Sequence, residues 1–227
     1  MRRALKHVPA EPLGAWDRLK LKPGAGLDRR VNSRRVSLGG VPVRLFKRKE
    51  AWAAWLDEQH GRSSGVWLRL AKKASGAESV SYTEALEVAL CYGWIDGQKR
   101  SESEYTWLQK FTPRSKRSIW SKINRRRALA LIKSGRMHRG GLKEIERAER
   151  DGRWAAAYDS PRTAAVPGDF RAALDRNARA KASFAALDGR NRYAVLFRIH
   201  TAKKAETRSA RIRLFIQMLE KNEKLHP

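Results

Sequence analysis

The sequence is poor in the residues that build disulfides and metal centres. It contains a single cysteine, Cys91, which excludes an intrachain disulfide and a cysteine-based zinc site. The five histidines are scattered, and none follows the spacing of a metal-binding helix or finger. We therefore expect neither a structural metal nor a resident cofactor.

Long hydrophobic runs and the motifs of common enzymes are also missing. Apolar runs such as residues 128–132 are too short to cross a bilayer, and no apolar segment follows the basic start Met1-Arg2-Arg3. There is no glycine-rich phosphate loop, no nucleophile elbow and no pair of closely spaced carboxylates typical of acid–base catalysis. These features predict a cytoplasmic protein without a transmembrane segment.

Acidic residues are scarce relative to basic ones. The chain has 23 Asp and Glu against 50 Lys and Arg, a net charge of +27. This charge favours an anionic partner, which the composition leaves open as a small molecule, an acidic protein, nucleic acid or a membrane surface. Nucleotide bias in a genome also enriches arginine, so charge alone does not select among them. Apolar residues make up 41% of the chain and include eight tryptophans, which predicts a folded core.

Composition divides the chain into three segments. Residues 1–40 are predicted to form a basic, disordered arm, because prolines interrupt them and no helical or strand period runs through them. Residues 41–135 are predicted to form an α+β domain and residues 136–227 a helical region. The expected fold class is α+β, with a small antiparallel sheet and helices followed by an all-helical C-terminal half.

Hydrophobic periods locate the elements of the α+β domain. The predicted order is a helix over 49–59, a buried strand over 66–70, a helix that Gly93 ends, and an antiparallel hairpin over 94–112. Ser81 or Thr83 is expected to cap the second helix. The strand over 66–70 is expected to join the hairpin in one sheet.

Helices are predicted through the rest of the chain. Their ranges are about 119–133, about 140–150, one from Gly168, about 178–200 with a break near Asp188-Gly189, and one bearing Ile212, Phe215, Ile216 and Leu219. Ser118 is expected to cap the first of these helices, Gly135 to end it, and Thr207 to cap the last. Residues 161–167 are expected to be a linker.

The strongest charge feature is the stretch over residues 113–140, which holds ten Lys and Arg and no acid. Ser118 at a helix N-terminus would leave backbone N–H groups facing an anion, and Arg114 could bind a phosphate or carboxylate with two hydrogen bonds. Trp120 and Trp107 could stack on a base or pack on apolar neighbours. In the structural alternative Ser118 is only a cap, Trp120 belongs to the core, and the cations form a solvated surface. A second basic cluster over residues 190–213 is either structural or, if it shares a face with the first, part of a nucleic-acid groove.

The stretch "CYGWIDGQKR" places a thiol close to a tryptophan and a carboxylate. Cys91 lies near the C-terminal end of its predicted helix, where the helix dipole disfavours a thiolate, and the nearest histidines are His60 and His138. A buried, small apolar role is therefore expected for Cys91. Asp96 is expected to accept hydrogen bonds or to line a pocket that it shares with Trp94 and Arg114.

Several unusual strings occur in one order along the chain: "WAAWLDEQH", "GVWLRLAKK", "SYTEALEVALCYGWIDGQKR", "FTPRSKRSIWSKIN", "GRMHRGGLKEIERAERDGRW", "VPGDFRAAL" and "AKKAETRSARI". Together they closely resemble the YdeI/OmpD-associated proteins, also called the bacteriocin-protection or OmdA-like family, over about Val41–Lys221. The resemblance implies a bacterial protein whose front half is YdhG-like and whose rear half carries the OmpD-associated motif from about Val166 to Leu219. It implies a role in stress or bacteriocin resistance, and it assigns neither a reaction nor catalytic residues.

The leading hypothesis is a non-enzymatic binding protein with a basic, tryptophan-lined pocket for an anionic ligand or an acidic partner. The residues predicted to form this pocket are Trp94, Asp96, Arg114, Ser118, Trp120 and Asn124. A nucleic-acid-binding protein that uses its basic surface is the first alternative. An enzyme that uses Cys91 or Asp96 is the second.

Overall fold

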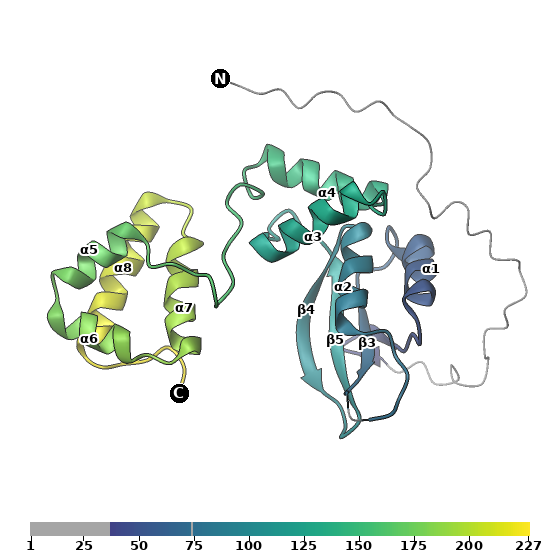
Figure 1. Cartoon of the computed structure of the whole chain (residues 1–227), viewed down its shortest axis with the longest axis horizontal. Coiled ribbons are helices and arrows are strands. Elements are labelled where there is room, and N and C mark those ends of the chain that lie inside the picture. Colours follow the sequence, from purple (N-terminus) through teal and green to yellow (C-terminus); the bar gives the residue numbers. More distant parts are fainter. Residues whose placement is uncertain (1–36, 74) are drawn as a thin grey trace, which may run out of the picture. The chain divides into compact units, whose positions relative to one another are not determined.

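The computed structural model describes residues 37–73 and 75–227, which form two compact units (Figure 1). The sheet unit comprises the described residues up to Ser118 together with Arg126–Arg150. The helical unit comprises Ile119–Arg125 and Asp151–Pro227. Most of the predicted basic arm, residues 1–36, lies outside the described residues.

The sheet unit is built on five strands in the order β1-β2-β3-β5-β4. Their bounds are β1 Ser37–Leu38, β2 Val41–Arg44, β3 Val66–Ala71, β4 Trp94–Ser101 and β5 Thr106–Pro113. Strand β2 runs parallel to β3, and the other neighbours are antiparallel. The predicted hairpin and its pairing with the strand at residues 66–70 are confirmed. The first strand begins at Ser37, four residues before the predicted start of order.

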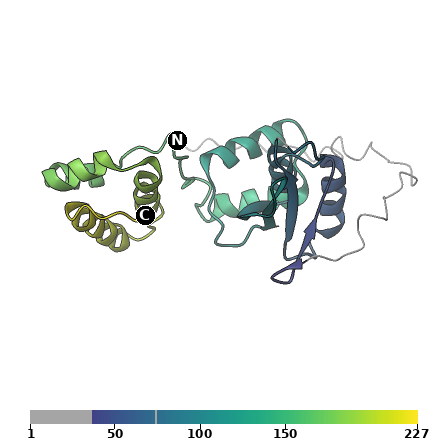
Figure 2. The ribbon, with the colours of Figure 1, turned by 90° about the horizontal axis from the view of Figure 1, so that it is seen from below.

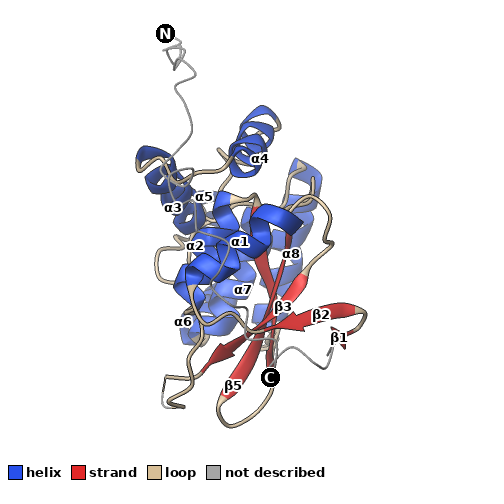
Figure 3. Ribbon diagram, turned by 90° about the vertical axis from the view of Figure 1, so that its right-hand side faces the viewer, coloured by secondary structure: helices blue, strands red, loops and turns tan. Residues whose placement is uncertain are grey.

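Helices α1 (Lys49–Gln59) and α2 (Tyr82–Cys91) lie against one face of the sheet (Figure 3). The aromatic core of the unit forms between them and the strands. The indole of Trp52 stacks on Trp55 at 5.3 Å between ring centroids and meets Phe111 at 5.8 Å. Its N–H donates to the carbonyl of Ala85 at 3.0 Å, so the buried polar atom is satisfied. The core thus ties α1 to both α2 and β5.

Both ends of α2 follow the predicted local signals. Ser81 accepts the Glu84 N–H and Glu84 accepts the Ser81 N–H, a complete capping box. Gly93 has φ +75°, a conformation that glycine adopts without steric cost, and it follows the last helical turn.

The predicted start of the next helix is wrong. Helix α3 spans Lys122–Lys133, and Ser121, rather than Ser118, accepts the N–H of Asn124 at 3.1 Å. The backbone before it is extended because it pairs with a distant residue: Tyr158 N–H donates to Trp120 O, and Lys122 N–H donates to Tyr158 O. The hydroxyl of Ser118 instead accepts the Ser115 N–H in a tight turn. Gly135, with φ +67°, follows α3 as predicted.

Helix α4 (Arg139–Arg150) also belongs to the sheet unit, and it begins against the end of α2. The N–H of His138 donates to the carbonyl of Cys91 at 3.1 Å. A Cβ on Gly141 would lie 2.5 Å from that same carbonyl oxygen, so only a glycine permits this approach.

The helical unit contains α5 (Gly168–Asp175), α6 (Ala178–Ala186), α7 (Gly189–His200) and α8 (Ala205–Glu220), shown together in Figure 2. Their buried core consists of Phe170, Leu174, Ala180, Phe184, Val195, Leu196, Ile199, Phe215 and Leu219. The predicted break is confirmed, since Asp188 caps α7 by accepting the Asn191 N–H. The predicted cap at Thr207 is wrong, because α8 already begins at Ala205. Within 161–167, the predicted linker, Ala164 and Val166 pack against this core.

The confirmed fold class is therefore α+β, with the sheet in the N-terminal half and helices in the C-terminal half. Among the described residues, no helix combines the length and the apolar character needed to span a membrane.

Candidate functional site

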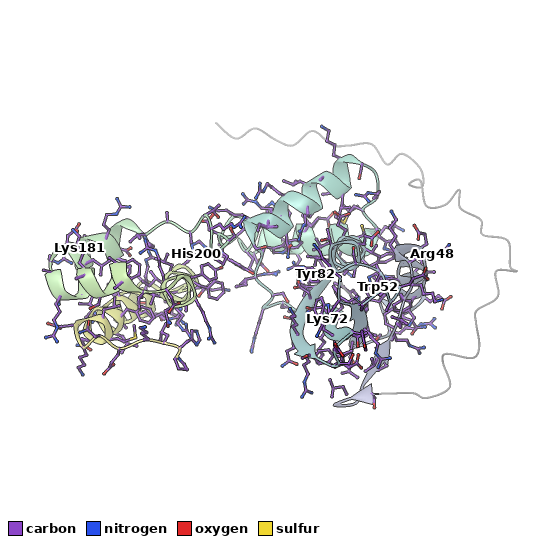
Figure 4. The ribbon with its side chains drawn as sticks, turned by 60° about the horizontal axis from the view of Figure 1, so that its bottom comes forward. Arg48, Trp52, Lys72, Tyr82, Lys181 and His200 are labelled. Carbon is purple, nitrogen blue, oxygen red and sulfur yellow. The ribbon has the colours of Figure 1, made fainter. Side chains whose placement is uncertain are left out.

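A hollow of about 670 Å³ opens in the sheet unit beside the N-terminus of α2. Figure 4 labels two of its side chains, Lys72 and Tyr82. Its lining consists of three lysines, four hydroxyl side chains, an indole and two apolar side chains: Lys72, Lys73, Lys99, Ser81, Tyr82, Thr83, Ser101, Trp107, Leu70 and Ala71. Positive charge and aromatic rings meet in this hollow around an apolar floor, which makes it the candidate functional site.

Strand register aligns the floor of the hollow. Leu70 of β3 lies opposite Trp107 of β5, which in turn lies opposite Ser101 of β4. Directly opposed residues of antiparallel strands project from the same face of a sheet. The three side chains therefore share one face, the one on which Leu68 and Phe111 are buried against the helices.

A β-bulge brings Lys99 to this face. The register of β4 against β5 shifts between Asp96 and Lys99, so that Lys99 lies opposite Gln109. Without the extra residue Lys99 would oppose Leu108, whose side chain projects from the other face. The buried Gln109 stabilises the bulge, since its side-chain nitrogen donates to the carbonyls of Gly97 and Gln98 at 3.0 and 3.2 Å.

The aromatic side chains of the hollow have polar partners. The ammonium of Lys99 lies over the Trp107 ring, 4.6 Å from its centroid, a cation–π contact. The Tyr82 and Trp107 rings are 6.0 Å apart. The hydroxyl of Tyr82 donates to Asp96 at 2.8 Å, so Asp96 orients the tyrosine that lines the hollow. Lys72 donates to the carbonyl of Ser103 at 2.8 Å, which directs this lysine along the hairpin turn.

Glu84 follows directly on Ser81, Tyr82 and Thr83, which line the hollow. The carboxylate of Glu84 accepts both the hydroxyl and the N–H of Ser81, and these bonds lower its pKa. Its negative charge compensates the N-terminus of α2. The attraction of the hollow for an anion therefore comes from the lysines rather than from the helix end.

The four predicted site residues of the sheet unit lie elsewhere or at its margin. Trp94 is buried in the core and donates its indole N–H to His60 O at 3.2 Å. Arg114 is also buried; its N–H donates to Gly93 O and its carbonyl accepts from Arg147. Ser118 belongs to the turn before α3. Asp96 reaches the hollow through the hydrogen bond that it accepts from Tyr82.

The other two predicted residues belong to the helical unit. Trp120 is buried, with its ring centroid 4.8 Å from that of Trp154, and Asn124 lies half-buried in the first turn of α3. None of the six predicted side chains lines the 670 Å³ hollow or the small cavity of about 30 Å³ beside Tyr193 in the helical unit. A single pocket made of all six residues stays a prediction.

The fold assembles a second titratable cluster that sequence spacing did not reveal. The rings of His60, Tyr92 and His138 come from three separate segments, with centroid distances of 4.6 to 5.4 Å. The Nδ1 of His138 accepts the Gly140 N–H at 3.2 Å, and its Nε2 lies 3.8 Å from a carboxylate oxygen of Asp57. Because Nδ1 acts as an acceptor, the fold selects the neutral imidazole at the start of α4.

Because of His138, we expect the stability of the sheet unit to decrease in acid. Burial, and then the neighbouring His60, lower the pKa of His138, while Asp57 opposes the shift and Arg139 adds to it. A folded pKa below the unfolded value of about 6.5 means that stability is complete above pH 6.5 and is lost as the pH falls through the folded pKa. The urea concentration at the unfolding midpoint should therefore decrease as the pH is lowered from about 7.5 to about 5. The decrease should be smaller in His138→Asn, because asparagine can still accept a hydrogen bond at the start of α4 and does not titrate. His200→Asn is the control; equal pH dependence in wild type and His138→Asn would contradict the prediction.

Cys91 is buried, as predicted. Burial raises the pKa of its thiol to about 11, although Arg136 favours the thiolate. At neutral pH the thiol is protonated, so the geometry does not favour it as a nucleophile. Within the described ranges, no three His, Cys, Asp or Glu side chains are grouped so that they could hold a metal ion.

Comparison with known families gives two separate matches, one in each half of the chain. Residues 163–222 match the family described as "Bacteriocin-protection, YdeI or OmpD-Associated", which confirms the resemblance on this part of the chain. Residues 44–144 match a domain of unknown function (DUF8412). The YdhG-like character of the front half stays a prediction. No curated protein and no solved structure matches the chain.

Proposed function

We propose that this protein is a non-enzymatic binding protein of the bacteriocin-protection group, and that its sheet unit holds a small anionic ligand in the hollow beside α2. The observation that carries the proposal is the arrangement of Lys72, Lys73 and Lys99 around the aromatic wall formed by Tyr82 and Trp107. The bacteriocin-protection role rests on the match of residues 163–222.

Electrostatics supports an anion in this place. The net charge of +27 raises the local concentration of anions at the protein surface. Ammonium groups that converge on a partly apolar hollow bind a phosphate or carboxylate more strongly than the same groups spread over an open surface, because less water competes for them. The described residues that line the hollow include three lysines and no acidic side chain, and Asp96 lies behind the Tyr82 hydroxyl that donates to it.

Replacing the lysines should weaken anion binding. We expect Lys72→Gln and Lys99→Gln each to lower the affinity for pyrophosphate several-fold at low salt, because each change removes one ammonium from the hollow. Lys133→Gln, an exposed site on α3 outside the hollow, removes the same charge and should change the affinity little. Isothermal titration calorimetry measures the difference. Equal losses in all three variants would assign binding to the overall charge and reject the hollow.

The same variants test the cellular role. In a bacterial strain that lacks this protein, the wild-type gene should restore survival under bacteriocin challenge. The double variant Lys72→Gln/Lys99→Gln should fail to do so although it accumulates to the same level. Full protection by the double variant would separate the hollow from bacteriocin protection.

Nucleic-acid binding is the second candidate. Residues 151–227 contain 16 Lys and Arg against 8 Asp and Glu, and four of these acids are paired with basic side chains: Asp151, Asp159, Asp169 and Asp175. Exposed cations of this kind bind phosphate backbones with a steep salt dependence. Retention on DNA that survives the double lysine variant and falls with salt would favour this candidate over the hollow.

A further inference from the structure

We infer that the ligand of the hollow combines a planar ring with a phosphate group, as a nucleoside monophosphate does. The inference rests on the proposed function and adds the chemical class of the ligand. Its basis is the distribution of polar and apolar groups around the hollow.

The volume of the hollow exceeds what an inorganic anion needs. At about 670 Å³ it lies within the usual range for small-molecule sites, whereas one water molecule takes up roughly 30 Å³ of liquid. Its floor contains the buried Leu70, which shares a face of the sheet with Trp107. A bare phosphate would leave the half-buried indole of Trp107 in contact with water, so the ligand needs an apolar part.

The aromatic wall identifies that apolar part as a ring. The indole of Trp107 is half-buried and faces the hollow, and the Tyr82 ring stands beside it at an interplanar angle of 44°. An indole in this setting offers a π-face on which a planar ring stacks. The ammonium of Lys99 lies over this indole, 4.6 Å from its centroid, so a ring that stacks on the same face displaces the lysine side chain toward the phosphate.

The lysines locate the anionic part at the rim. Lys72 and Lys73 follow directly on the end of β3, and Lys99 comes from the bulge of β4, so cations from two separate strands face one space. Lysine binds phosphate as a point charge and does not demand a fixed orientation. A ring held at Trp107 therefore places its phosphate among these three ammonium groups.

Calorimetry on the full chain with three probes tests the inference: adenosine 5′-monophosphate, inorganic phosphate and adenosine. We expect the monophosphate to bind at least about tenfold more tightly than phosphate, in line with the contribution of base stacking. Trp107→Leu should remove this advantage and leave phosphate binding unchanged, while Trp107→Phe, which keeps a ring, should retain most of it. The Phe variant also shows that the position tolerates replacement in a folded protein.

Each outcome has a separate meaning. Equal affinity for phosphate and the monophosphate would overturn the ring and leave the proposed anion site intact. An advantage that persists in Trp107→Leu would place the ring outside this hollow and overturn the inference. Binding of neither anion would overturn the proposed function and the inference together. Adenosine that binds as well as its monophosphate would show that the phosphate adds nothing to recognition, and would overturn the inference on that ground.

Discussion

Gly141→Ala should lower the free energy of unfolding of the sheet unit by about 2 kcal/mol or more. A Cβ at this position would lie 2.5 Å from the carbonyl oxygen of Cys91 and 2.8 Å from that of Leu90. Both are backbone atoms at the end of α2, so the two helices would have to move apart. In an open helix the same change would gain about 1 kcal/mol, because alanine is the better helix former. The clash exceeds this gain.

Two neighbouring glycines also allow the close approach of α2 and α4, because glycine has no Cβ. A Cβ on Gly93 would lie 2.7 Å from the Gly140 carbonyl oxygen, and a Cβ on Gly140 would lie 2.9 Å from the Tyr92 carbonyl oxygen. The strings "CYGW" and "RGGL", both part of the family resemblance, are thus the two sides of one helix contact. The glycines of both strings therefore serve the packing of α2 against α4.

Urea unfolding followed by tryptophan fluorescence measures the effect. Five of the described tryptophans report on this unit: Trp52, Trp55, Trp67, Trp94 and Trp107. Gly97→Ala is the matched control, because a Cβ there would meet only Lys110 O at 3.8 Å, and we expect a change within about 0.5 kcal/mol. A Gly141→Ala protein as stable as the Gly97→Ala protein would contradict the close contact between α2 and α4.

Arg208→Ala should destabilise the helical unit by about 1 to 2 kcal/mol. The guanidinium of Arg208 holds three helices together: from α8 it donates to both carboxylate oxygens of Asp169 in α5, at 2.6 and 2.8 Å, and to the carbonyl of Ile199 at the end of α7, at 2.9 Å. The expected effect is at the low end for charged hydrogen bonds because Asp169 is half exposed. The string "AKKAETRSARI" therefore carries a structural arginine.

Hydrogen exchange localises this loss. We expect faster exchange of amides in α5, α7 and α8 in Arg208→Ala, and no change in Arg213→Ala, an exposed arginine on the same helix. Arg208→Lys should be intermediate, since lysine keeps the charge but not the two-point contact. The hydrogen bond to Arg208 lowers the pKa of Asp169, so the difference between wild type and Arg208→Ala should shrink as the pH falls through that pKa. Exchange that is unchanged in Arg208→Ala would reject the linking role.

Signals between neighbouring residues were sufficient for most elements. The capping box at Ser81, the end of α2 at Gly93 and the hairpin over residues 94–112 were all predictable, because turn geometry and hydrophobic period depend on residues close in sequence. The start of α3 was not, since Tyr158 pairs with the backbone on both sides of Ser121 across more than thirty residues of chain.

The residues of the candidate site were harder to predict from the sequence than the helices and strands. Sequence predicted a basic site with tryptophan for an anion, but it selected Trp94, Arg114 and Trp120, which the structure buries. Charge and aromatic content are visible in composition, whereas exposure depends on what packs against each side chain. Nothing in the sequence separates a tryptophan of the core, such as Trp94, from a half-buried one, such as Trp107 on the inner strand β5.

By itself, then, the sequence determined the α+β class, most helix ends, the excess of positive charge and the family resemblance of the C-terminal part. Tertiary structure alone decided which cations meet which rings. The bulge in β4 moves Lys99 across the sheet to Trp107, and chain packing brings His60 to His138. The physical reason is that a one-residue shift in strand register reverses the face of every side chain after it, and composition does not record that shift.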